Sequence, residues 1–62
     1  MNQAGTINFR DATDSDEAAV IIRYDERSVA VCRSKKSGGE MEVLMDKDDA
    51  KILLKALQKA VA

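Results

Sequence analysis

The chain has 62 residues with a formal net charge of −1; 45% are hydrophobic, 34% are charged, and proline, tryptophan and histidine are absent. A chain of this length forms one small domain, and its apolar content excludes wholesale disorder. No apolar run approaches the ~20 residues that a membrane-spanning helix needs, and the first ten residues lack a signal-peptide pattern. We therefore expect a cytoplasmic protein without a membrane contact.

Residues that usually carry enzyme chemistry are scarce. Without histidine, neither Ser–His–Asp nor Cys–His catalysis is available. The single cysteine, Cys32, can form neither an internal disulfide nor a Cys/His zinc site, and we interpret it as a small, partly buried apolar residue. No glycine-rich phosphate-binding motif occurs. The sequence thus predicts a protein that is not an enzyme and holds no metal and no cofactor.

The first element in chain order is a short strand at residues 6–10, and whether it joins the sheet is left open. An acidic stretch follows at residues 11–17, with four carboxylates and no basic residue. We interpret this stretch as a solvated, mobile loop, because it has no large apolar side chain to bury. It lacks the mid-loop glycine of an EF-hand, which argues against a calcium site.

The next three elements are predicted strands. Residues 18–24, AAVIIRY, are rich in β-branched side chains and bounded by charged clusters. A three-residue polar connection leads to residues 28–34, SVAVCRS, and its shortness indicates an antiparallel hairpin. A turn with two glycines then leads to residues 40–45, EMEVLM. Residues 18–45 are therefore predicted to form an antiparallel β-meander.

The last element is a helix over residues 46–61. Asp46 is a suitable N-cap, and Asp48 and Asp49 lie in the first turn, where the helix dipole favours negative charge. One apolar stripe recurs at helical spacing: Ala50, Leu53, Leu54, Leu57 and Val61. The predicted fold class is α+β, in one domain of residues 1–62. A three- to four-stranded antiparallel meander is followed by one amphipathic helix packed on one sheet face.

Self-association is expected from the small size of the chain. Domains of this size usually need a disulfide, a metal or a partner subunit, and one helix covers only one face of a sheet that is moderately apolar on both. Beside the main stripe, the helix carries Ile52, Ala56 and Ala60 at successive i+4 positions, where the small residues allow another helix to approach. We predict a homodimer, with Ile52, Ala56 and Ala60 as the dimer or partner surface.

A basic segment around the second turn supports a different hypothesis. Arg33, Lys35 and Lys36 precede two glycines, and Arg23 on the neighbouring strand could join the same basic side to bind an anion or a nucleic acid. The isoelectric point of 5.2 and the presence of only two aromatic residues argue against this hypothesis. Lysines at a hairpin tip also prevent edge-to-edge aggregation. We therefore prefer a non-enzymatic homodimeric protein-interaction or regulatory module, with single-stranded nucleic-acid binding as the alternative.

The order of the elements, strands followed by one helix, resembles the transcriptional coactivator and whirly group of single-strand DNA-binding proteins. This resemblance implies a dimer that binds single strands on a basic curved sheet. The lysine-glycine-aliphatic strand motif that precedes the helix in that group is absent, and Gly38, Gly39 and Glu40 stand there instead. The resemblance therefore assigns no site residue in this chain.

Overall fold

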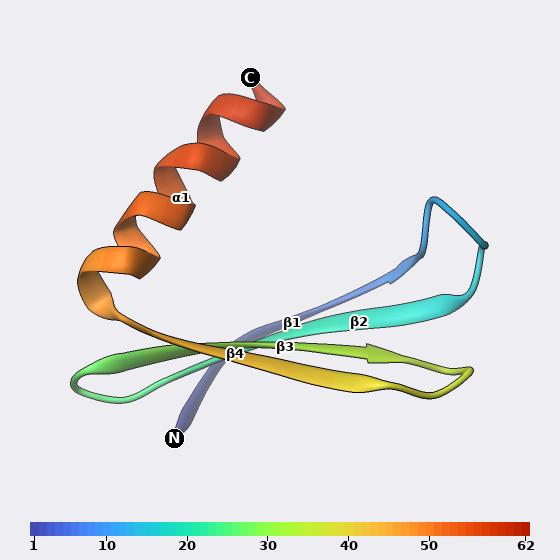
Figure 1. Ribbon diagram of the computed structural model, residues 1–62, viewed down its shortest axis with the longest axis horizontal. Helices are drawn as coiled ribbons and strands as arrows, with labels where there is room; N and C mark the ends of the chain where they lie inside the picture. Colours follow the sequence, from blue (N-terminus) through green and yellow to red (C-terminus); the bar gives the residue numbers. More distant parts are fainter.

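A computed structural model describes all residues from 1 to 62 and shows a four-stranded antiparallel sheet followed by one helix (Figure 1). The strands pair in chain order, so that the first and the fourth strand form the two edges of the sheet. The predicted α+β fold class is confirmed, with four strands rather than three. The elements are β1 (Asn2–Arg10), β2 (Glu17–Tyr24), β3 (Ser28–Lys35), β4 (Glu40–Asp46) and α1 (Lys47–Val61).

β1 is longer than the sequence pattern suggested, because it begins at Asn2 rather than at residue 6. Its pairing with β2 shifts register between Gln3 and Gly5, which leaves Ala4 without a partner residue. The residues before position 6 show no apolar–polar alternation, so that the pattern could not reveal them as a strand. Every residue of β1 is exposed.

The register assigns the side chains to two faces of the sheet, because they alternate along each strand and match across it. One face carries the apolar set Ile7, Phe9, Val20, Ile22, Tyr24, Val29, Val31, Met41, Val43 and Met45, together with Arg33 and Lys35. The opposite, outer face is mixed in character and carries Thr6, Asn8, Ile21, Arg23, Ala30, Cys32, Ser34, Glu40, Glu42 and Leu44.

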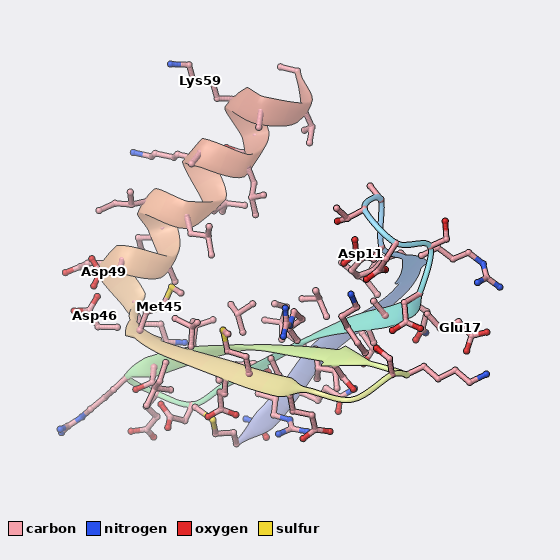
Figure 2. All side chains as sticks on the ribbon, turned by 45° about the vertical axis from the view of Figure 1, so that its right-hand side comes forward. Asp11, Glu17, Met45, Asp46, Asp49 and Lys59 are labelled. Carbon is pink, nitrogen blue, oxygen red and sulfur yellow. The ribbon has the colours of Figure 1, made fainter.

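The helix stands on the apolar face, which we call the helix-side face. The ammonium group of Lys47 lies 5.2 Å from the centre of the Tyr24 ring, and Tyr24 belongs to that face. Figure 2 shows Met45, from the same face, beneath the start of the helix. The β1–β2 loop rises on this side as well, at the opposite end of the sheet (Figure 1).

α1 begins at the residue that follows the end of β4. Asp46 is both the last residue of the strand and the N-cap of the helix, with φ −75° and ψ 172°. Its carboxylate accepts a hydrogen bond from the Asp49 N–H at 2.8 Å, which confirms the predicted cap. The backbone of the helix lies close to β3 and β4 and then rises away from the sheet (Figure 1). It is neither long nor apolar enough to cross a membrane.

The interior of a single chain is very small. Only Ala18 and Ala30 are buried, and no residue of α1 is. The chain exposes 4972 Å², whereas a folded monomer of 6.8 kDa exposes about 4,000 Å². Its radius of gyration of 12.6 Å also exceeds the value of about 11 Å for a compact domain of this length. A single chain therefore leaves about 1,000 Å² more surface open than a monomer of its mass.

Candidate interaction surface

The helix-side face is mostly apolar and largely uncovered, with exposed Arg33 between Val20 and Met41. On the β1 edge, Ile7 is 61% exposed, and on the β4 edge Val43 is 48% exposed. Met41 and Phe9 are exposed on the same face. The exposed apolar residues of this face make it the candidate interaction surface of the chain.

The apolar stripe of α1 continues this surface away from the sheet. Ala50, close to the sheet, is half-buried. Further along the stripe, Leu53 is 37% exposed, Leu54 and Leu57 are 55% and 53% exposed, and Val61 is 82% exposed. The chain's own sheet therefore covers only the beginning of a stripe that stays apolar to its end.

The second ridge of α1, predicted as the partner surface, lies beside this stripe. Ile52, Ala56 and Ala60 are all exposed, on adjacent turns of the helix. Their role in an interface remains a prediction. The sequence pattern predicted these three residues as the partner surface because the main stripe was expected to pack on the chain's own sheet. The pattern did not reveal that Leu57 and Val61 are also uncovered. A periodic apolar stripe indicates that a helix packs against another surface, but it does not indicate which surface.

The acidic β1–β2 loop was expected to be solvated and mobile. In the structure it is held by ion pairs and hydrogen bonds to the end of β3 and the turn that follows (Figure 2). The Lys35 ammonium lies 2.6 Å from the Asp14 carboxylate and 3.3 Å from that of Asp11. Asp16 accepts hydrogen bonds from the hydroxyl and the backbone N–H of Ser37, at 2.6 and 3.1 Å. No group of three carboxylate or thiol side chains is placed to hold a metal ion. The carboxylates of this loop therefore anchor it to the sheet.

These contacts shift the pKa values of the groups involved. Hydrogen bonds from the hydroxyl and the N–H of Thr13, assisted by Lys35, lower the pKa of Asp11 to about 2. The Lys35 ammonium lowers the pKa of Asp14, and the hydrogen bonds from Ser37 lower that of Asp16. In turn, Asp14 raises the pKa of Lys35. Lys35 thus stays charged and is already paired within its own chain.

The four basic residues of the nucleic-acid hypothesis do not form one cluster. Arg23 pairs with Ala30 and belongs to the outer face, whereas Arg33 pairs with Val20 and belongs to the helix-side face. The two arginines thus occupy positions on opposite faces, although both are among the lining residues of one hollow. Lys35 is bound to two aspartates, and the Lys36 ammonium lies 3.6 Å from the Glu17 carboxylate.

One hollow of the sheet is lined by charges of both signs. Its volume is about 230 Å³, and Arg23, Arg33, Glu40 and Glu42 are among its lining residues. The two glutamates offset the two arginines, so the hollow offers no net positive charge to a phosphate.

Cys32 on this outer face is held as a thiol. Its Sγ donates a hydrogen bond to Glu42 Oε2 at 3.1 Å. This bond, together with partial burial, raises the pKa of Cys32 above its usual value. Because the thiolate is the reactive form, the geometry does not make Cys32 a nucleophile.

Comparison of the chain with protein-family models, with curated proteins and with solved structures found no significant match. The resemblance to the coactivator and whirly group therefore rests on the order of four strands and one helix alone. A shared element order carries no function by itself.

Proposed function

We propose that this chain is a non-enzymatic homodimeric module for protein interaction or regulation, and that it associates with a second copy of itself through the helix-side face and the apolar stripe of α1. The observation that carries the proposal is the excess of about 1,000 Å² of open surface over a monomer of this mass. A stable interface of standard size buries about 800 Å² per partner. One such interface accounts for the excess.

The chemistry of the surface supports a second copy as the occupant. In a two-fold symmetric dimer the same patch serves both chains, so that an apolar face can cover an identical apolar face. The chain has no disulfide that could stabilise it instead, since Cys32 is its one cysteine. The free thiol also fits a reducing compartment, and we place the module in the cytoplasm.

Sedimentation equilibrium with a matched pair of variants tests this proposal. Val43 and Leu44 are neighbours on β4, but Val43 belongs to the helix-side face and Leu44, 60% exposed, to the outer face. The wild-type chain is expected to sediment at twice 6.8 kDa at micromolar concentration. Val43→Lys should shift the population toward monomer, and Leu44→Lys should leave the dimer intact. A wild-type species of 6.8 kDa up to high micromolar concentrations would contradict the proposal.

The nucleic-acid alternative makes a separate, measurable claim. Because Arg23 and Arg33 lie on opposite faces and the neighbouring lysines are paired, we expect no binding to oligonucleotides tighter than about 100 μM at physiological salt. Titration of labelled single-stranded and duplex oligonucleotides at two salt concentrations measures this. Salt-sensitive submicromolar binding that is lost in Lys35→Glu/Lys36→Glu would replace the interaction module with the nucleic-acid alternative.

A further inference from the structure

We propose that the two copies exchange helices: residues 54–61 of each α1 pack on the helix-side face of the other chain's sheet. This inference rests on the proposed homodimer and specifies which surfaces of the two copies meet. Three features of the structure carry it: the open end of the helix, the fixed direction of the helix, and the open half of the sheet.

The open end of the helix requires cover that its own sheet does not supply. The stripe is apolar at Leu54, Leu57 and Val61, yet the first two side chains are more than half exposed and Val61 is 82% exposed. Apolar surface of this kind is stabilised by removal from water. Lys55 and Lys59 lie on the side of the helix away from the stripe, and Figure 2 shows Lys59 pointing away from the β1–β2 loop. One side of the helix is therefore suited to burial and the other to solvent.

The direction of the helix is fixed where it leaves the sheet. No residue separates β4 from α1, because Asp46 ends the strand and caps the helix through its bond to the Asp49 N–H. The ammonium of Lys47 over the Tyr24 ring holds the first turn against β2. Neither proline nor glycine occurs between residue 40 and the end of the chain to supply a hinge. The cap and the Lys47–Tyr24 contact both favour the present direction of the helix, which carries its last turns away from its own sheet.

The sheet leaves open the half that the helix does not reach. Apart from the contact of Lys47 with Tyr24 of β2, α1 lies against β3 and β4 and does not reach β1. The uncovered half includes Ile7 and Phe9 on the helix-side face, both exposed. A two-fold axis parallel to the face brings the helix of the second copy over this half, and the same rotation brings the first helix over the second sheet.

The length of the helix matches this arrangement. Fifteen residues span about 22 Å along the axis. Packed layers lie about 10 Å apart, so a layer of helices between two sheets separates the sheets by about 20 Å. A helix that begins on one sheet and rises from it therefore reaches the other with its last turns. The result is a three-layer dimer in which both helices lie between the two sheets.

Disulfide trapping between two differently marked chains tests the exchange. One chain carries Val61→Cys and the other Ile7→Cys, each with Cys32→Ser, and the two are unfolded, mixed and refolded before oxidation. We expect a disulfide-linked heterodimer as the main covalent product, because Val61 of one chain lies over the β1 half of the other. The matched control replaces the Ile7→Cys chain with wild type, whose Cys32 lies on the outer face, and should give no link to the Val61→Cys chain.

A second measurement leaves the sheet unmodified apart from Cys32→Ser. A spin label on the Val61→Cys chain, mixed with ¹⁵N-labelled chain that carries only Cys32→Ser, should broaden the amide signals of β1 in the labelled chain. The outer-face control places the same spin label on Cys32 of the wild-type chain.

Each remaining outcome is decisive. Monomers in sedimentation of the unmodified chain would overturn the homodimer itself. The chain could also remain dimeric but form disulfides only between two Val61→Cys chains, or between Val61→Cys and Cys32, with no broadening of the β1 signals. This result would overturn the exchange and leave the homodimer standing. An intrachain disulfide in a monomeric Ile7→Cys/Val61→Cys/Cys32→Ser chain would show that α1 closes on its own sheet, and would also overturn the exchange.

Discussion

The ammonium of Lys35 lies 2.6 Å from the carboxylate of Asp14, although 21 residues separate the two in the chain. The same ammonium lies 3.3 Å from Asp11, so one side chain of β3 holds two points of the β1–β2 loop. The Lys35 side chain is only 15% exposed, because the loop folds over it. The loop is thus part of the folded unit rather than a free tether between two strands.

Replacing Lys35 should loosen this loop without unfolding the sheet. In Lys35→Met, Asp11 and Asp14 lose their cation, and amide hydrogen exchange in residues 12–16 should accelerate several-fold. Lys36→Met is the matched control, since Lys36 is 72% exposed and lies 3.6 Å from Glu17. Equal exchange rates in the two variants would show that the Lys35 contacts do not order the loop.

Acid should weaken the fold over a defined pH range. The pKa of Asp11 is about 2 in the folded chain, below its ordinary value of 3.8. A lowered pKa contributes stability that is complete above the ordinary value and is lost as the pH falls through the folded value. The urea midpoint should therefore fall between about pH 4 and pH 2. In Asp11→Asn this slope should be shallower, and a slope identical to wild type would contradict the assignment.

Alkali should act through the other partner of the same contact. The pKa of Lys35 is raised by Asp14, so its contribution is complete below the ordinary value of 10.5 and is lost as the pH rises through the higher folded value. Urea midpoints measured above pH 10 should fall more steeply in wild type than in Lys35→Met. If the urea midpoint falls equally steeply with pH in wild type and in Lys35→Met, deprotonation of Lys35 does not contribute to the loss of stability.

Removing the helix cap should cost a measurable part of the stability. Asp46→Ala removes the acceptor of the Asp49 N–H bond and is expected to lower the free energy of unfolding by about 1 kcal/mol. Asp48→Asn changes charge in the same turn without touching the cap and should cost only about 0.3 kcal/mol. Urea unfolding at one fixed chain concentration measures both, because the stability of a dimer depends on concentration.

Gly38, in the β3–β4 turn, and Gly5, in β1, should respond in opposite directions to replacement by alanine. Gly38 has a φ of 111°, so Gly38→Ala forces an L-residue into an unfavourable backbone region and should cost about 1–2 kcal/mol. Gly5 has no positive φ, and nothing lies within 4 Å of the position of an added Cβ. Gly5→Ala should therefore be neutral or stabilise the fold by about 0.5 kcal/mol. Thermal unfolding of the two variants, side by side, gives the sign of each effect.

The Cys32 thiol should react slowly with alkylating reagents at neutral pH. Its bond to Glu42 raises its pKa, so that little thiolate is present. In Glu42→Gln the carboxylate is gone, and alkylation by iodoacetamide at pH 8 should become faster. Glu40→Gln, which removes a more remote carboxylate, should change the rate less. A rate that is unchanged in Glu42→Gln would contradict the role of Glu42.

Local patterns determined much of the fold from the sequence alone. The β-branched runs of β2 and β3, the alternation in β4, and the cap at Asp46 depend on neighbours within a few residues, and the structure confirms each element. The edge strand β1 was only partly recognisable, because its first residues are polar and small. The homodimer was also inferred from sequence, from the small size of the chain, and it remains a proposal.

Other features depended on relationships that no local pattern contains. The register between β2 and β3 decided that Arg23 and Arg33 face opposite sides, since a shift by one residue would have exchanged the faces. The long-range contact of Lys35 with Asp14 decided that the acidic loop is anchored. Sequence determined that α1 has an apolar stripe. Only the tertiary structure decided that this stripe leaves its own sheet, because the direct junction at Asp46 sets the angle between β4 and the helix.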